Sequence, residues 1–372
     1  MDFKAVDTLV EQGIKDGIFP GAAYAVGHKG KVIHQNAKGR HTYCPDSQAT
    51  TVDGLWDLAS VSKVVGTTTG AMILFDQGKL HFDQPVAEII PDFAQNDKGK
   101  ITLRNLLLHD SGLAAFHGYQ LTLTTPEECI AAIYADKLAY PTGTKMVYSD
   151  LGMIAFGKLI ETISGRTFTA FLNEKVFQPL GMSSTTYNPV IQMRERAAPV
   201  EAVEPWRAKL RKLRGTDTEE VRQLEKEPDG TSWVRGEVHD PNAMLLGGVA
   251  GHAGLFSTVG DLCKFMSMML KKGDGIIKSD TVEMFTKRQT EESSRGLGWD
   301  TKSEGSSSGH LFSNKSFGHT GYTGTCVWGD PENDTFAILL TNRVHPSSEN
   351  TKIIGFRPKF HDAVFHAIHG WI

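Results

Sequence analysis

The sequence predicts an α/β (α+β) protein in which an antiparallel sheet, built from both ends of the chain and flanked by helices, accompanies an all-helical part. Near the start, apolar residues at 22–28 and 31–37 are separated by a Lys-Gly turn and predict a hairpin. Near the end, residues 324–328 and 335–340 predict two more strands. The residues between these ends read as helices, so a single core requires the strands of both ends to share one sheet.

The helices are predicted mainly from apolar residues at helical spacing. The first covers residues 3–10 and ends near Gly13 to Gly17. Small and apolar residues over 61–77 predict a buried helix. Further helices are expected at 103–108, 127–135, 151–164, 168–176 and 359–369.

A chain of 372 residues can form one large domain or two intimate subdomains. We expect residues 1–58 and 294–372 to be the two parts of an α/β subdomain, and residues 59–293 to be a helical subdomain. No internal repeats interrupt this division.

Residues 192–235 form an insertion that is dense in both charges and poor in large apolar residues. Its basic run at 207–214 could bind nucleic acid, but the acidic residues around it favour a solvated helical insertion. Residues 216–219 match a capping box that opens a further short helix. We expect a surface flap near the functional site.

Composition is that of a soluble globular enzyme, with 40% hydrophobic and 22% charged residues. The net charge of −4 provides no basic field for nucleic acid, and no apolar run has the length of a membrane span. The first residues predict an amphipathic helix rather than a signal peptide, which favours a cytoplasmic location, with a trimmed export signal as the alternative.

No metal or cofactor is expected. The four cysteines have neither metal-ligand nor redox spacing, and those at 129, 263 and 326 are expected to be buried thiols. Four histidines are expected to be hydrogen-bonding residues of loops or core rather than zinc ligands: His109, His117, His239 and His252.

Ser60 and Lys63 form the only Ser-x-x-Lys pattern in the chain. Residues three apart lie on one face of a helical turn, so an amine there can take the hydroxyl proton and make the serine a nucleophile. A polar first helical turn has the same pattern. The motifs that accompany it therefore decide between these two interpretations.

Two triplets follow in order, Tyr-Ser-Asp at 148–150 and His-Thr-Gly at 319–321. With them the chain resembles the penicillin-recognising serine hydrolases, in particular the branch with class C β-lactamases, related esterases, D-aminopeptidases and D-alanyl-D-alanine carboxypeptidases. Other segments that resemble this branch lie at 101–113, 140–144, 251–258 and 296–299. The resemblance implies a β-lactamase/penicillin-binding-protein-like fold, with the active site in a cleft between two subdomains.

The resemblance implies that Ser60 is the nucleophile, at a helix N-terminus whose dipole favours an alkoxide. Lys63 and Tyr148 are implied to move the proton together. A neutral Lys63 would be the acceptor itself, whereas beside a charged Lys63 the Tyr148 phenol, with its pKa lowered, would be the base. The alternative for Tyr148 is a core tyrosine. The backbone N–H groups of Ser60 and Tyr322 are implied to form the oxyanion hole, and Gly321 allows close approach of a strand.

Two positions differ from the β-lactamases. His319 stands in place of a lysine, and an imidazole that charges only below about pH 6 weakens the anchoring of a substrate carboxylate. Asp150 stands in place of an asparagine and can only accept hydrogen bonds when ionised, so we expect it to bind Lys63 or a substrate amine. With Thr320 and Gly321, these residues are the expected substrate contacts. Both changes favour esters, or peptides with a free amino end, over β-lactams.

Two other patterns suggest serine hydrolase chemistry of a different kind. Residues 305–309 match Gly-x-Ser-x-Gly, but no apolar strand precedes them and no helix follows, so we expect a mobile loop rather than a nucleophile elbow. His109 with Asp110 suggests a Ser-His-Asp triad. Because Lys63 and Tyr148 already supply the proton chemistry, we expect His109 to position a helix end.

The main hypothesis is a serine hydrolase that cleaves a small carboxylic ester through an acyl-enzyme on Ser60. The alternative is a D-amino-acid peptidase or carboxypeptidase, or a weak β-lactamase, that uses the same site on short peptides or amides. A third hypothesis is a non-catalytic relative that binds a peptide, but a binder does not need Ser60, Lys63 and Tyr148 together. The sequence indicates no oligomeric state.

Overall fold

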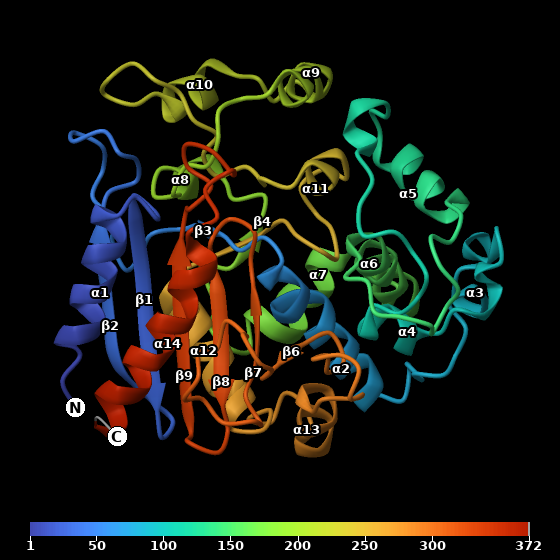
Figure 1. Ribbon diagram of the computed structural model, residues 1–372. Coiled ribbons are helices and arrows are strands. Elements are labelled where there is room, and N and C mark those ends of the chain that lie inside the picture. Colours follow the sequence, from blue (N-terminus) through green and yellow to red (C-terminus); the bar gives the residue numbers. More distant parts are fainter. Residues whose placement is uncertain (371–372) are drawn as a thin grey trace.

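A computed structural model describes residues 1–370 and contains a six-stranded antiparallel sheet of order β2-β1-β9-β8-β7-β6 (Figure 1). Two strands come from the chain start and four from its end: β1 (Gly21–His28), β2 (Lys31–Gly39), β6 (Asp300–Thr301), β7 (Phe317–Thr320), β8 (Cys326–Asp330) and β9 (Thr335–Thr341). The two ends meet where β1 pairs with β9, with Ala22 opposite Thr341. The predicted sheet from both chain ends is confirmed.

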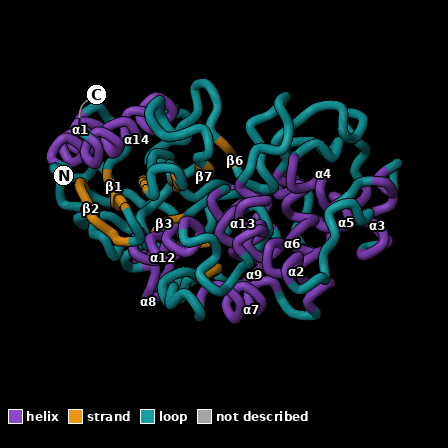
Figure 2. Tube along the Cα trace, turned by 90° about the horizontal axis from the view of Figure 1, so that it is seen from below, coloured by secondary structure: helices purple, strands orange, loops and turns teal. Residues whose placement is uncertain are grey.

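Helices cover both faces of this sheet. Helices α1 (Lys4–Lys15) and α14 (Ile353–His369) pack side by side on one face, and α12 (Val259–Leu270) packs against the other (Figures 1 and 2). Strand β1 is therefore buried along its whole length. Helix α14 begins well before residue 359, the predicted start, and passes through Pro358, because Ile353 and Phe356 pack into the core beneath it.

The middle of the chain is mainly helical, as predicted, and forms a large core with the inner face of the sheet. Its helices are α2 (Thr69–Asp76), α3 (Val86–Ile89), α4 (Leu103–Leu108), α5 (Pro126–Ala135), α6 (Asp150–Ser164), α7 (Phe168–Leu172), α11 (Pro241–Leu245) and α13 (Ser279–Thr286). The predicted boundaries at 58 and 294 stay a prediction. Helix α12, which falls inside the expected helical subdomain, packs against the sheet.

Three local features differ from the prediction. The predicted helix 61–77 is π-helical over Lys63–Thr68, and the helix predicted over 168–176 turns π-helical at Asn173–Phe177. A small sheet of order β3-β5-β4 was not predicted, because β3 (Trp56–Asp57), β4 (Thr186–Tyr187) and β5 (Leu255–Ser257) are too short to show alternation.

The insertion is helical, with α8 (Ile191–Arg194), α9 (Pro205–Arg214) and α10 (Glu219–Glu225). It is less solvated than predicted. Arg207 and Arg211 from the basic run are only 2% exposed and pair with Glu237, while Arg211 also pairs with Glu225. These arginines hold the insertion to the chain that follows it and are not available to nucleic acid.

The capping box predicted at 216–219 does not form, because the third residue after the N-cap of α10 is Val221, whose side chain cannot accept a hydrogen bond. Thr218 is the N-cap of α10, and its side chain accepts a hydrogen bond from the backbone N–H of Val221.

Among residues 1–370, no helix has both the length and the apolar character that crossing a bilayer requires.

Candidate active site

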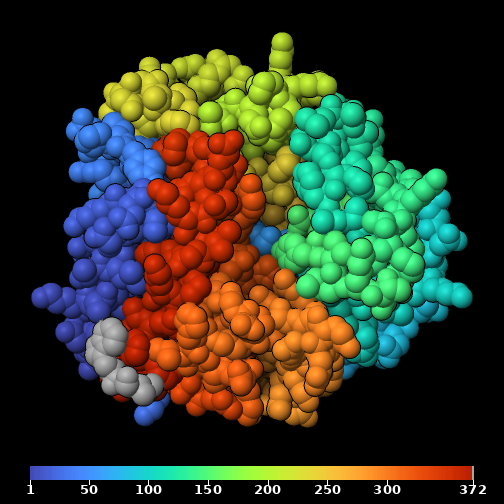
Figure 3. Space-filling view, in the orientation of Figure 1, coloured from blue at the N-terminus to red at the C-terminus, as the bar shows by residue number. Residues whose placement is uncertain are grey.

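A cleft of about 540 Å³ opens between the sheet and the helical part, and Ser60 lies on its wall. The space-filling view shows the hollow between the C-terminal segments in orange and red and segments from the middle of the chain in green (Figure 3). The predicted residues Tyr148, His319, Thr320, Gly321 and Tyr322 line the same cleft. The structure therefore brings together motifs that lie far apart in the sequence.

Ser60 sits on a tight turn between β3 and the π-helical segment. Ala59, directly before it, has a φ of 46°, a conformation that costs a residue with a side chain about 1–3 kcal/mol. The side chain of Asp57 supports this turn by accepting a hydrogen bond from the Ala59 N–H at 2.8 Å. The backbone oxygen of Ser60 accepts from the Lys63 N–H at 3.0 Å, which starts the helix and places both side chains on one face.

Lys63 is fully buried, and its Nζ lies 2.9 Å from Ser60 Oγ, 3.0 Å from the His252 backbone oxygen and 2.6 Å from Asp150 Oδ1. Burial lowers the pKa of Lys63, but the Asp150 carboxylate and Tyr148 outweigh it and leave the pKa above its usual range. Lys63 is therefore charged in the resting protein. This disfavours the first of the two proton acceptors left open by the sequence, a neutral Lys63.

Tyr148 is buried beside Lys63, with its ring centroid 4.9 Å from Nζ, and its hydroxyl interacts with the side chains of Lys63 and Ser60. Burial raises the pKa of Tyr148 more than the Lys63 cation lowers it. The expectation of a lowered phenol pKa was therefore wrong. The interaction of the hydroxyl with Ser60 and Lys63 favours the catalytic role over that of a core tyrosine, and this role stays a prediction.

His109 holds the segment that carries Tyr148. It ends α4 with a φ of 59°, its ring lies 4.6 Å from the Tyr148 ring, and its Nδ1 accepts from the Ser149 N–H at 3.1 Å. Burial, and then the nearby cations, hold the pKa of His109 well below its usual value. His109 thus positions a helix end, as predicted, rather than serving in a triad.

The backbone at Gly321 passes very close to the turn before Ser60. A Cβ on Gly321 would lie 2.4 Å from the Leu58 oxygen and 2.1 Å from Thr325 Oγ1, so only glycine fits. This contact brings the Tyr322 N–H to the Ser60 side of the cleft. Among residues 1–370, neither that N–H nor the N–H of Ser60 donates to a protein acceptor, which suits two oxyanion donors.

His319 is 4% exposed, and its Nδ1–H donates to the Thr320 oxygen at 2.8 Å. Burial, followed by the Arg295 and Lys63 cations, holds the pKa of His319 well below its ordinary value. The expectation of a neutral imidazole at pH 7 holds. The expectation that it charges below about pH 6 was wrong.

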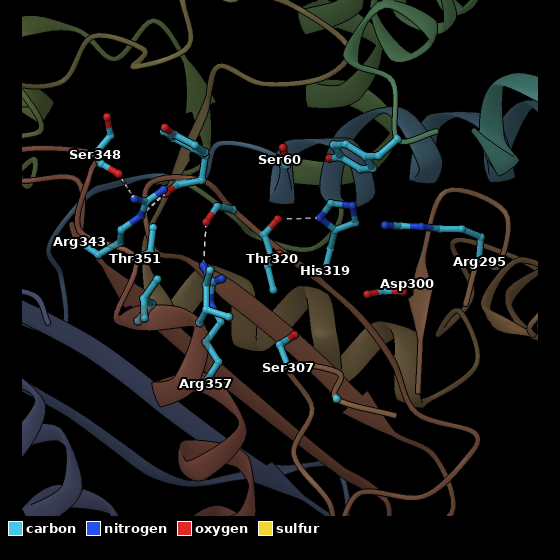
Figure 4. Close-up of a pocket in the computed structure, with 16 residues that line it drawn as sticks. Ser60, Arg295, Asp300, Ser307, His319, Thr320, Arg343, Ser348, Thr351 and Arg357 are labelled. Atoms are coloured by element: carbon cyan, nitrogen blue, oxygen red, sulfur yellow. Dashed lines mark hydrogen bonds between the residues drawn. The ribbon is translucent and has the colours of Figure 1, made fainter. Parts of the chain in front are cut away.

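Arg295 is a cleft residue that sequence reasoning missed. It precedes the 296–299 segment, and that position was the only available signal. Its guanidinium lies 5.2 Å from the Tyr148 ring, and its Nε and Nη1 are buried without a partner within residues 1–370. In Figure 4 the side chain extends toward His319. Arg295 therefore supplies a permanent positive charge close to His319, where the sequence predicted no permanent cation.

Two more arginines line the cleft on the other side of Ser60 (Figure 4). Arg343 Nε donates to the Tyr322 oxygen at 2.7 Å, and Arg357 Nη2 donates to the Gly321 oxygen at 2.8 Å. Their bonds to backbone oxygens fix the strand end that carries the Tyr322 N–H.

The Gly-x-Ser-x-Gly match at 305–309 is a loop, without the strand and helix of a nucleophile elbow. It is held more firmly than predicted, because Ser307 Oγ accepts from Trp328 Nε1 at 2.9 Å and Ser306 and Ser308 share a 2.6 Å hydrogen bond.

Three cysteines are buried as predicted, and burial raises their pKa values to about 12: Cys129, Cys263 and Cys326.

Of the four histidines expected to form hydrogen bonds, the three besides His109 lie beside carboxylates: His117 with Asp136 at 3.5 Å, His239 with Glu201 at 2.6 Å, and His252 with Asp240 at 2.7 Å. Ligand atoms of Asp150, Asp240 and His252 lie within 4.8 Å of one another. Lys63 forms an ion pair with this group through Asp150.

A serine beside a buried lysine, set between an antiparallel sheet and a helical part, defines a serine hydrolase of the Ser-x-x-Lys type. The sequence model of the Beta-lactamase family matches residues 6–355. The chain belongs to this family of serine hydrolases.

Relatives and solved structures agree with this assignment. The chain is 34% identical over 321 residues to a putative D-alanyl-D-alanine carboxypeptidase of Escherichia coli K12, covering 79% of this chain and 70% of the relative. It is 30% identical over 377 residues to an N-acetylmuramyl-L-alanine amidase of Bacillus subtilis, covering 92% and 81%. Two solved structures share the fold at 21% identity: the hydrolase EstCE1, with a TM-score of 0.74 over 97% of this chain and 98% of that one, and a penicillin-binding protein homologue from Caulobacter crescentus, with 0.73 over 98% and 97%.

Proposed function

We propose that this serine hydrolase works through an acyl-enzyme on Ser60 and acts on short peptides or amides whose leaving group carries a carboxylate, as a D-amino-acid carboxypeptidase does. The observation that carries the substrate class is Arg295, a half-buried residue on the wall of the Ser60 cleft, two of whose nitrogen atoms are buried without a partner in the described chain. Guanidinium groups bind carboxylates through charge-assisted hydrogen bonds. The names of the Escherichia coli relatives support the same class.

The proposed reaction begins when Ser60 Oγ attacks the scissile carbonyl carbon and its proton leaves through the group formed by Lys63 and Tyr148. The N–H groups of Ser60 and Tyr322 bind the oxyanion, and such donors contribute a few kcal/mol in the transition state. The same protonated group returns the proton to the leaving nitrogen or oxygen. Water then hydrolyses the Ser60 ester, with the groups acting in reverse.

Ester cleavage is the second candidate, and the neutral His319 favours it. With no charge on that imidazole, His319 itself offers no cation to a leaving-group carboxylate and does not disfavour an uncharged leaving group. The acyl-enzyme route is the same for an ester and an amide, so the two candidates differ only in which leaving group the cleft binds.

A substrate panel tests the proposal. An acetylated peptide ending in D-Ala-D-Ala, its L-Ala-L-Ala counterpart, p-nitrophenyl acetate and nitrocefin are compared on the wild type and Ser60→Ala. The proposal expects Ser60-dependent release of D-Ala and little release of L-Ala. Turnover of the neutral ester alone supports the second candidate. Turnover that persists in Ser60→Ala contradicts both.

The cytoplasmic location expected from the sequence stays a prediction.

A further inference from the structure

The partners of Lys63 leave little choice for the destination of the Ser60 proton. An ammonium has three N–H donors, and Nζ of Lys63 contacts three acceptors: Ser60 Oγ, the His252 backbone oxygen and Asp150 Oδ1. Lys63 is completely buried, so water does not replace any of them. Lys63 can accept a proton from Ser60 only after it has given one up. Tyr148 also interacts with Lys63, but a neutral phenol does not take up a proton, so only the Asp150 carboxylate can hold it.

We propose that Asp150, acting through Lys63, is the proton acceptor when Ser60 attacks. Lys63 passes one proton to Asp150 Oδ1 over 2.6 Å, and the resulting amine takes the Ser60 proton as Oγ forms its bond to the carbonyl carbon. Lys63 ends as an ammonium, Asp150 as a neutral acid, and the negative charge rests on the substrate oxygen. The reverse transfers give a proton to the leaving group. This inference rests on the proposed function, and it replaces the expectation that Asp150 contacts substrate.

Other charged or titratable groups also face the pair, and they set the background for its pH dependence. They come from the segment before α6, the chain around α11, the end of α4, β7 and the chain before β6: Tyr148, Asp240, His252, His109, His319 and Arg295. Asp240 is the useful comparison, because its carboxylate is close to that of Asp150 but pairs with His252. It therefore supplies the same charge without a contact to Lys63 Nζ.

The test is the pH profile of kcat/KM for p-nitrophenyl acetate in the wild type, Asp150→Asn, Asp150→Glu and Asp240→Asn. In Asp150→Asn the acceptor must be Lys63 itself, which is active only as a free amine. We therefore expect kcat/KM at pH 7 to fall at least about tenfold, with the acid limb moved up by about one pH unit or more and activity recovered at alkaline pH. Asp150→Glu should keep the wild-type limb at a lower rate, and Asp240→Asn should move the limb by less than about half a unit.

Other outcomes overturn the proposal. If Asp150→Asn lowers kcat/KM equally at every pH, Asp150 only holds Lys63 in place. If it raises KM for a substrate with a free amine and leaves the neutral ester unchanged, Asp150 binds substrate. If the acid limb of the pH profile moves as far in Asp240→Asn as in Asp150→Asn, the effect comes from the loss of a nearby negative charge and not from proton transfer to Asp150.

Labelling separates failure of this inference from failure of the proposed function. A fluorophosphonate probe should modify Ser60 in the wild type whatever the role of Asp150. If the wild type is labelled at Ser60 and the acid limb of Asp150→Asn does not move, the inference alone fails. If Ser60 is not labelled, the proposed function fails. Thermal unfolding of Asp150→Asn checks that a slow variant is folded, and Asp150→Glu provides an independent reading if it is not.

Discussion

Replacing Arg295 with glutamine should separate substrates by the charge of their leaving group. In the wild type, Arg295 lines the cleft, and two of its nitrogen atoms are buried without a protein partner. A hydrogen bond to a charged group contributes about 1.5–3 kcal/mol, which corresponds to roughly 10- to 150-fold in kcat/KM. We expect Arg295→Gln to lose that factor on a peptide with a C-terminal carboxylate. The same peptide with a C-terminal carboxamide should lose less than about threefold.

The assay measures release of D-Ala or D-Ala amide from the two peptides by chromatography at several substrate concentrations. Arg222→Gln is the matched control, because it removes an exposed guanidinium, 57% accessible, that pairs with Asp217 outside the cleft. It should leave both substrates unchanged. An equal loss on carboxylate and carboxamide in Arg295→Gln would refute carboxylate binding and reduce Arg295 to a support for the Tyr148 ring, which it contacts at 5.2 Å.

Three further predictions follow from the cleft and the insertion. Ser60→Ala should lose more than about a thousandfold in kcat/KM, whereas Ser307→Ala should still be labelled at Ser60; the reverse pattern would move the nucleophile. His319→Lys should raise kcat/KM for a carboxylate-bearing β-lactam by less than about fivefold, because the new ammonium would lie beside Arg295. In the wild type, the ratio of turnover of that β-lactam to turnover of a neutral ester should stay constant from pH 7 to about 5, because the pKa of His319 is far below its usual value. Arg211→Ala should lower the free energy of unfolding in urea by about 3 kcal/mol, because it leaves the buried Glu225 carboxylate without its cation; a change below about 1 kcal/mol would contradict a structural role.

The sequence was a good guide wherever the signal was local. The hairpin of β1 and β2 and the strands β8 and β9 were predicted because short apolar stretches there are bounded by turn residues. Ser60 and Lys63 were paired correctly because their spacing alone puts them on one helical face. The strands of the small β3-β5-β4 sheet were missed because two or three residues carry no periodic pattern.

The electrostatics of the cleft could not be predicted residue by residue. Weak binding of carboxylates was predicted from His319 alone. That prediction took no account of Arg295, which reaches the cleft from the chain before β6. The lowered pKa expected for Tyr148 ignored burial, which is a property of the packed core. Arg207 and Arg211 looked solvent-exposed because their partner Glu237 lies beyond the insertion.

The most direct test of the central claim is mass spectrometry of the protein after reaction with a fluorophosphonate probe, followed by peptide mapping. The account predicts one adduct, on Ser60, at a rate that falls sharply in Lys63→Ala and in Tyr148→Phe. Because these two residues act on one proton, the double variant should lose much less than the product of the two single losses. An adduct on any other serine, or a Ser60 adduct that forms equally fast without Lys63, would contradict the account.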